Sequence, residues 1–360
     1  MSAVSFLYSQ LFVDPPIPTD DFKGQTVVIT GANRGLGFEA ARHLLRLGAS
    51  RVILGVRSLE KGREAADMLC KCTGRRREVV EVRKLDMACH KSVQNFASAM
   101  AAYDRLDAVL LNAGIYTQDF VMVDGHESTL TINVINTFLL AILLLPALRS
   151  SGRKAKASPR MSIVASDRHV MVQLPRSQME SIFAVLDDEK RANMNDRYYV
   201  SKLMQILLVR ALAERLRPSK GSPVGEPYPV IVNTLTPGYC KSELLKDAHP
   251  AAAFGFWVLA KATARTTEQG GRSLVAAISQ GEESHGKYLN DCVIDDSALS
   301  SYVRSCEGRL AQEKLWNELS QILEQRTSGI RHLIKTESSD EVQERLGEMR
   351  LRRATDADGV

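Results

Sequence analysis

Tyr198 and Lys202 stand four positions apart in the segment YYVSKL, a spacing that places both side chains on one face of a helix. A nearby ammonium stabilises phenolate over phenol and so lowers a tyrosine pKa from its usual value of about 10 toward neutrality. Such a tyrosine can act as a general acid and base. The neighbouring Tyr199 is followed four positions later by Leu203, which offers no cation. The same spacing also fits an ordinary surface pair, so the prediction depends on the residues around it.

A glycine-rich turn follows a β-branched run near the start of the chain. The run 26–30 (TVVIT) leads into the turn 31–37 (GANRGLG) and then into a helical pattern. Glycines let the backbone approach a pyrophosphate, and a helix N-terminus supplies free N–H groups and a positive dipole end. This order of strand, turn and helix favours a nucleotide site over a turn without a ligand. The predicted contacts are Gly31, Asn33, Arg34, Gly35, Leu36 and Gly37.

The end of the second predicted strand indicates which nucleotide is bound. An acidic residue there would hold a ribose 2′-OH, but this chain has Arg57 followed by Ser58. Arg57 and Arg34 can form charge-assisted hydrogen bonds to a 2′-phosphate. The sequence therefore favours NADP(H) over NAD(H), with a solvated surface position as the alternative for each arginine.

Short β-branched runs alternate with longer helical patterns from Gln25 onward, which is typical of a parallel sheet covered by helices. We expect an α/β fold with a doubly wound parallel sheet (Rossmann fold) of about seven strands in a single domain. The expected strands are 26–30, 51–56, 79–85, 108–111, 161–165, 230–235 and 287–289. The expected helices are 38–47, 61–72, 92–103, 127–149 and 198–217.

The two ends of the chain differ from this pattern. Residues 1–21 form an apolar arm that ends in a proline-rich stretch and is too short for a signal peptide or a membrane span. We expect a helical arm packed on the body, with weak membrane contact as the alternative. The domain proper covers 22–330, and the charged, aromatic-free tail 331–360 predicts a frayed helix or disorder. The apolar run 138–148 (FLLAILLLPAL) is also too short to span, so no transmembrane segment is expected.

Composition excludes several classes of function. The 360 residues are 44% hydrophobic and 25% charged, as in a globular protein, with a net charge of +5. The one basic run, 75–77, lacks interleaved aromatics, so no nucleic acid partner is expected. The six cysteines lack metal-ligand spacing, which predicts no metal and reduced thiols in an intracellular, cytoplasmic protein. His126, His169 and His285 are isolated and are interpreted as structural or exposed.

In combination and in this order, the motifs resemble those of the short-chain dehydrogenase/reductase family over about residues 22 to 295. Thr30 to Gly37 matches the family's T-G-x-x-x-G-x-G loop, and Tyr198 and Lys202 match its Tyr-x-x-x-Lys. The other family positions are matched by Asp86 (adenine contact after the third strand), Asn112–Ala113–Gly114 (after the fourth), Asn133 (on a helix), Ser166 (end of the fifth strand) and Pro237–Gly238 (after the sixth). The phrases YYVSKL, TPGY and TTEQGG are similar to those of retinol-dehydrogenase-like and fungal secondary-metabolism reductases.

The resemblance implies a division of roles in reducing a carbonyl. NADP(H) would carry the hydride, and Tyr198 would donate the proton, or abstract it in the alcohol-oxidising direction. Ser166 would hydrogen-bond the same oxygen, and Lys202 would lower the Tyr198 pKa and bind the nicotinamide ribose. Asn133 would hold a water that links Lys202 to solvent. Alternatively, Ser166 caps the loop after its strand and Asn133 satisfies a helix backbone.

The stretch between Ser166 and Tyr198 spans 32 positions, which is long for the family. Its insertion, 168–197, contains an amphipathic piece (MESIFAVL) and predicts a lid or a substrate wall. A second wall is expected from 239–265, with Leu244, Leu245, Phe254, Phe256, Trp257 and Leu259. Together they would form an apolar pocket for a bulky lipophilic carbonyl or alcohol. The same residues would equally well pack against the core or against a second subunit of a homodimer.

Three functions fit these features. The first is an NADPH-dependent oxidoreductase of a ketone or aldehyde, in fungal secondary metabolism. The second is a non-redox catalyst, such as an isomerase or cyclisation enzyme, that keeps the cofactor site. The third is an NADP-binding protein without turnover, which would have no need of the intact Ser166, Tyr198 and Lys202. Fold alone does not separate the first two.

Overall fold

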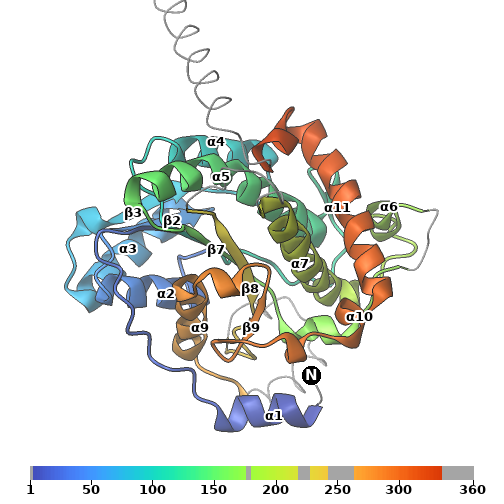
Figure 1. The fold of residues 1–360 in the computed structure, drawn as a ribbon, viewed down its shortest axis with the longest axis horizontal. Coiled ribbons are helices and arrows are strands. Elements are labelled where there is room, and N and C mark those ends of the chain that lie inside the picture. Colours follow the sequence, from blue (N-terminus) through green and yellow to red (C-terminus); the bar gives the residue numbers. More distant parts are fainter. Residues whose placement is uncertain (1–2, 176–179, 218–227, 242–262, 335–360) are drawn as a thin grey trace, which may run out of the picture.

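A mostly parallel β-sheet forms the centre of the molecule (Figure 1). The computed structural model describes residues 3–175, 180–217, 228–241 and 263–334. Eight strands lie in the order β10-β9-β8-β7-β4-β1-β2-β3, and all pairs are parallel except β9 with β10. The strands are β1 (Thr26–Thr30), β2 (Arg51–Val56), β3 (Val80–Lys84), β4 (Ala108–Leu111), β7 (Arg160–Val164), β8 (Ile231–Leu235), β9 (Tyr288–Asn290) and β10 (Val293–Ile294). The doubly wound parallel sheet predicted from the sequence is confirmed.

The strand count is eight instead of about seven because β9 and β10 form a short hairpin. Its two turn residues, Asp291 and Cys292, have φ of 50° and 69°, a left-handed conformation at both central positions that suits a tight hairpin turn. A strand of two residues leaves no hydrophobic run in the sequence, which is why β10 was not predicted. A separate small hairpin pairs β5 (Met122–Val123) with β6 (His126–Glu127).

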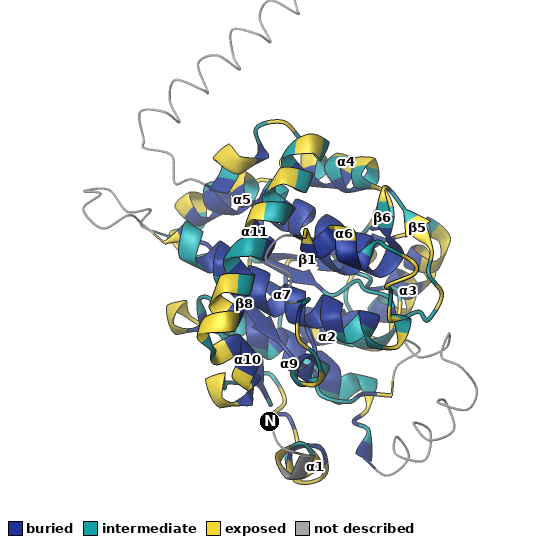
Figure 2. Ribbon diagram, turned by 90° about the vertical axis from the view of Figure 1, so that its right-hand side faces the viewer, coloured by how far each residue is buried: buried dark blue, intermediate teal, exposed yellow. Residues whose placement is uncertain are grey.

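Helices cover both faces of the sheet, as Figure 1 shows. One face packs against α2 (Gly35–Arg46), α3 (Leu59–Thr73) and α9 (Thr267–Ser279), and the other against α4 (His90–Met100), α5 (Asn136–Ala155) and α7 (Met194–Leu216). Alternate strand residues face opposite cores: Val28 joins the α4, α5 and α7 side, whereas Val27 and Ile29 join the α2, α3 and α9 side. Both faces are buried in Figure 2, which explains the continuous apolar runs.

The helix expected over 127–149 is divided in the structure. A π-helical turn, η2 (Leu130–Ile135), precedes α5, and such turns occur mostly at functional sites. The combined helix Leu130–Ala155 is long and apolar enough to cross a membrane by composition, but 78% of its most apolar window is buried inside the structure. It packs with α4 and α7 in one hydrophobic core, so its composition is that of a core helix.

The N-terminal helix α1 (Ala3–Phe12) lies against the loops at the carboxyl ends of β8 and β9. The guanidinium of Arg265 donates to the backbone carbonyls of Ser9 (2.9 Å) and Val13 (3.0 Å) and to the carboxylate of Asp291 (2.6 Å). The backbone N–H of Tyr239 donates to the Gln10 side chain at 3.2 Å. The arm is therefore attached near the loop that follows β8.

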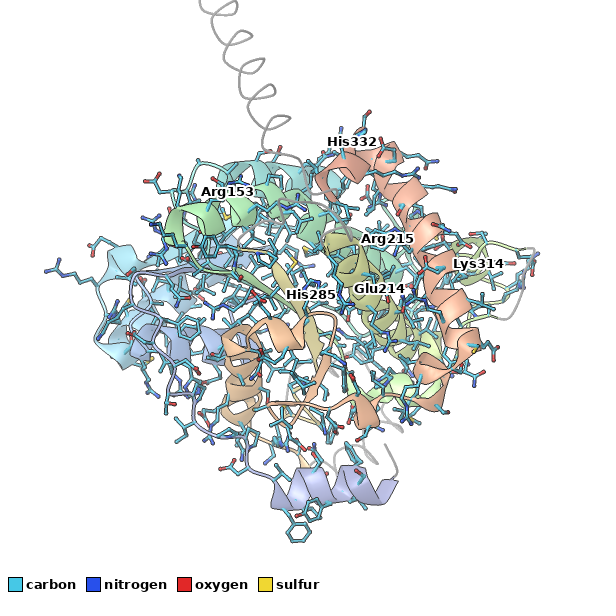
Figure 3. The ribbon with its side chains drawn as sticks, in the orientation of Figure 1. Arg153, Glu214, Arg215, His285, Lys314 and His332 are labelled. Carbon is cyan, nitrogen blue, oxygen red and sulfur yellow. The ribbon has the colours of Figure 1, made fainter. Side chains whose placement is uncertain are left out.

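The helix α11 (Cys306–Arg326) packs across α7 on the outside of the molecule. Figure 3 shows Glu214 and Arg215 at the end of α7 beside α11. Arg215 pairs with Glu313 at 2.7 Å and lies over the Trp316 ring at 4.7 Å. The short helices α10 (Ser301–Arg304) and η7 (Ile330–Ile334) flank α11, and Ile330 and Ile334 are buried in the same core.

The described part of the 168–197 insertion packs against this outer layer. It contains η3 (Asp167–Met171) and α6 (Ile182–Leu186). Ile182 and Phe183 are buried in the core, and the Ser181 hydroxyl donates to the Glu318 carboxylate of α11 at 2.8 Å. For these residues, packing against the core is the observed arrangement. Residues 176–179 lie outside the described ones.

Candidate active site

A cavity of about 560 Å³ opens at the carboxyl ends of the central strands. In open α/β sheets this is the edge at which ligands bind. Its walls are the loops after β1, β2, β3, β4, β7 and β8, together with the start of α7. The predicted site residues that line it are Gly31, Asn33, Arg34, Gly35, Leu36, Arg57, Asp86, Asn112, Ala113, Gly114, Ser166, Tyr198, Lys202, Pro237 and Gly238. The predicted site residues Gly37 and Asn133 are buried and do not line the cavity.

The glycine loop needs glycine at three of its positions. Gly31 and Gly35 have φ of 67° and 62°, a backbone conformation that residues other than glycine rarely adopt. A Cβ on Gly37 would lie 2.7 Å from Nδ2 of Asn112. The glycine loop can therefore pack against the loop after β4 only because position 37 has no side chain. Helix α2 begins at Gly35 without a side-chain cap from Arg34. Its first N–H groups are therefore left for an anion in the cavity.

Thr30 joins the glycine loop to the loop after β4. Its hydroxyl accepts hydrogen bonds from the backbone N–H groups of Asn112 (3.0 Å) and Ala113 (2.9 Å). The Asn112 side chain returns a bond to the Thr30 carbonyl at 2.9 Å. These contacts fix the floor of the cavity.

The end of the cavity beside β2 and β3 carries basic groups after β2 and an acidic group after β3. Arg57 lines it at the end of β2, and both Arg57 and Arg34 are exposed. The Lys84 ammonium donates to the Arg57 backbone carbonyl at 2.6 Å, which adds a third cation near the same strand end. Asp86 lines the next position, where its carboxylate accepts from the N–H of Ala88 at 3.0 Å.

Ser166 and Tyr198 line the opposite end of the cavity, where the Ser166 hydroxyl favours the ionised form of the Tyr198 phenol and so opposes the rise of its pKa. The Ser166 hydroxyl also accepts from the N–H of Arg168 (3.2 Å) and donates to the Asp167 carboxylate (3.1 Å). Ser166 therefore caps η3, which was the structural alternative, and faces Tyr198 as well. The Tyr198 ring packs against Tyr116 at 5.5 Å between centroids.

Burial controls the proton equilibria at this end. It raises the pKa of Tyr198 well above its usual value, with the Asp167 carboxylate acting in the same direction and the Ser166 hydrogen bond opposing it. Burial lowers the pKa of Lys202 to about 7. The ammonium lies 5.4 Å from the Tyr198 ring centroid. Burial thus outweighs the cation that we expected to lower the Tyr198 pKa.

Lys202 and Asn133 are both held by hydrogen bonds to other groups of the protein. Lys202 Nζ donates to the Val164 carbonyl at 2.7 Å and to Oε1 of Gln205 at 3.0 Å. The Asn133 amide binds both backbone groups of Ile115, each at 2.9 Å, and donates to Ser201 at 3.1 Å. Its side chain therefore fixes the loop after β4.

Asp167, Arg168, Gln205 and Tyr116 contact Ser166, Tyr198 or Lys202 but were not among the predicted site residues. Asp167 and Arg168 directly follow Ser166 and line the cavity, and their position next to that serine was the available signal. Gln205 follows Lys202 at the i+3 helical spacing, which brings side chains together. Tyr116 had no sequence signal, because only the fold places it against Tyr198.

The second predicted wall is described only at its beginning and its end. Tyr239, Cys240 and Lys241 line the cavity. The apolar residues predicted for this wall (Leu244, Leu245, Phe254, Phe256, Trp257 and Leu259) lie outside the described residues. Arg168 lies over the rings of Tyr239 (6.0 Å) and Phe6 of α1 (5.4 Å), which places the N-terminal arm near the rim. Within the described ranges, no cluster of His, Cys, Asp or Glu could hold a metal ion.

Comparisons with known proteins agree with this geometry. Residues 25–158 match the family model described as short chain dehydrogenase. The chain is 62% identical over 330 residues to short-chain dehydrogenase anuD of Penicillium roqueforti, covering 92% of this chain and 85% of the relative. It is 42% identical to short chain dehydrogenase/reductase dmxR8 of Cryptosporiopsis sp., covering 91% and 99%. A crystal structure of a putative uncharacterized protein from Mycobacterium Paratuberculosis is 27% identical, with a TM-score of 0.61 over 87% of this chain and 97% of that one.

Proposed function

This chain belongs to the short-chain dehydrogenase family of oxidoreductases, and on that premise we propose that it is an NADP(H)-dependent reductase of a lipophilic ketone or aldehyde. The reverse reaction would oxidise the corresponding alcohol. The observation that carries the proposal is that Ser166 and Tyr198 share one cavity with Lys202 and the glycine loop.

The cavity residues fit a dinucleotide along its length. The N–H groups at the start of α2 and the loop 31–37 would hold the pyrophosphate. Asp86 would contact the adenine, and Asn112, Ala113 and Gly114 would line the middle of the cofactor. Lys202 would bind the ribose next to the nicotinamide, and Pro237 and Gly238 would lie beside the ring. When bound, the nicotinamide supplies or accepts the hydride.

The preference for the phosphorylated cofactor comes from Arg57 and Arg34. Both guanidinium groups are exposed at the end of β2 and at the start of α2, where a 2′-phosphate would lie. Arginine binds phosphate through charge-assisted, bidentate hydrogen bonds. The positions directly after β2 are Arg57 and Ser58, so no carboxylate stands there to hold an unmodified ribose.

Tyr198 and Ser166 would act on the carbonyl oxygen of the substrate. Ser166 donates a hydrogen bond that holds the oxygen, and Tyr198 delivers the proton as negative charge develops there. With a cofactor bound, Lys202 would act as a cation close to Tyr198. A cation at that place favours the phenolate that is left after proton transfer. The aromatic groups Tyr116, Tyr199 and Tyr239 near this end suit a lipophilic substrate. The similarity to fungal chains supports a role in natural-product biosynthesis.

A screen of NADPH oxidation tests this proposal. Purified protein is incubated with NADPH and a panel of ketones, aldehydes and enones, and absorbance at the reduced-nicotinamide band is followed. Loss of NADPH with formation of one alcohol per NADPH consumed is the expected result. Product formation without any change in NADPH would instead establish a non-redox catalyst. Tight NADPH binding without NADPH oxidation, even when fungal extracts are added as a source of substrates, would favour a binding protein without turnover.

A further inference from the structure

Gln205 connects Lys202 to the backbone of Asn133. Its Oε1 accepts from Lys202 Nζ at 3.0 Å, and its Nε2 donates to the Asn133 carbonyl at 2.6 Å. Gln205 is 1% exposed and Lys202 is 4% exposed, so solvent does not compete for these bonds. The acceptor is the backbone carbonyl of Asn133 in the π-helical turn η2. Gln205 therefore ties Lys202 to the backbone of that turn.

The ammonium of Lys202 has three N–H donors. One is used by the Val164 carbonyl at 2.7 Å and a second by Gln205. The third remains for the cavity that Lys202 lines. Lys202 Nζ lies 3.8 Å from the place where a Cβ on Gly114 would stand, at the floor of that cavity.

We propose that Gln205 is a positioning residue that holds the Lys202 ammonium with one N–H directed to the cofactor side of the cavity. It links Lys202 directly to the Asn133 carbonyl. This inference rests on the proposed function, because the direction of the N–H matters only if the cavity binds a nucleotide. A carboxamide carries no titratable proton, so the bridge fixes Lys202 without offering it a proton path through Asn133.

The same contact has an electrostatic consequence. A carbonyl oxygen that accepts from an ammonium favours its charged form, so Gln205 opposes the lowering of the Lys202 pKa to about 7 by burial. A carboxylate at position 205 would favour the charged form more strongly, and an apolar side chain would not favour it. Titratable groups at the Lys202 end of the cavity include Tyr198 and Tyr199 on α7, Tyr116 after β4, and Asp167 and Arg168 after β7.

The test is a direct titration of Lys202 in the full-length protein. Lysine labelled with ¹³C at Cε is incorporated, and the Lys202 resonance, assigned by its loss in Lys202→Met, is followed against pH by NMR. Gln205→Leu should lower the midpoint by about one pH unit, and Gln205→Glu should raise it by about one. Gln312→Leu is the matched control, since Gln312 is also 1% exposed but lies on α11; it should leave the midpoint unchanged.

Opposite shifts in the two Gln205 variants would support the proposal. An unchanged midpoint, or shifts in the same direction for both, would overturn it. If Gln205→Leu does not fold, Gln205→Glu alone decides, because a role in packing predicts no rise in the midpoint. The titration needs neither cofactor nor substrate, so its outcome is separate from that of the NADPH screen.

Discussion

The imidazole of His169 joins the backbone carbonyl of Ser166 to the N-terminus of α10. Its Nδ1 lies 2.8 Å from the Ser166 carbonyl, and its Nε2 accepts from the Ser300 N–H at 3.2 Å. Because Nε2 is an acceptor, the ring is neutral with its proton on Nδ1. A histidine interpreted as structural from the sequence therefore supports the backbone that carries Ser166.

The first prediction concerns stability in mild acid. Burial lowers the pKa of His169 to about 4, against about 6.5 in the unfolded chain. Between these values the unfolded chain binds more protons, so the stabilisation is complete above pH 6.5 and is lost as pH falls toward 4. The shift corresponds to about 3 kcal/mol. Urea unfolding at several pH values should show a decline that is smaller in His169→Gln; an equal decline in both would contradict this account.

The second prediction separates the two adjacent tyrosines. Tyr198→Phe should lower turnover by roughly 10²- to 10⁴-fold, because it removes the group that transfers the proton. NADPH binding, measured by fluorescence titration, should change little. Tyr199→Phe is the matched control and should keep most of the activity, since Leu203 and not a cation stands four positions after it. Full activity in Tyr198→Phe would rule out the proposed acid.

The third prediction addresses cofactor choice. Arg57→Ala should weaken NADPH binding by roughly 10- to 100-fold and NADH binding much less, because a charge-assisted hydrogen bond to the 2′-phosphate is lost. Arg63→Ala, an exposed arginine on α3, serves as the control and should change neither. Dissociation constants come from quenching of protein fluorescence. Equal losses for both nucleotides in Arg57→Ala would place the phosphate elsewhere.

The fourth prediction concerns the attachment of the N-terminal arm. Arg265 is 3% exposed and is bound by Ser9, Val13 and Asp291. Arg265→Met leaves the Asp291 carboxylate without its cation, and should lower the free energy of unfolding by about 3 kcal/mol. Arg309→Met breaks an exposed pair with Glu214 and should cost less than about 1 kcal/mol. Chemical denaturation of both variants gives the comparison, and similar losses would mean that Arg265 does not anchor α1.

The sequence by itself predicted the sheet, since strands buried on both faces must be apolar throughout, as in 26–30 and 51–56. It also predicted which residues gather at the cavity, because the carboxyl ends of parallel strands meet at one edge. Local patterns were sufficient for both. The antiparallel β10 was missed because a strand of two residues has no periodicity to detect.

Only the tertiary structure decided what surrounds the reacting groups. The spacing of Tyr198 and Lys202 predicted a lowered tyrosine pKa, but burial, which depends on every neighbouring element, raises it. The contact of Gln205 with Asn133 was likewise decided by packing, because a side chain on α7 and a carbonyl in η2 meet 72 positions apart in the chain. A sequence pattern specifies which groups are present and in what order, whereas their desolvation and hydrogen-bond partners come from contacts between distant segments.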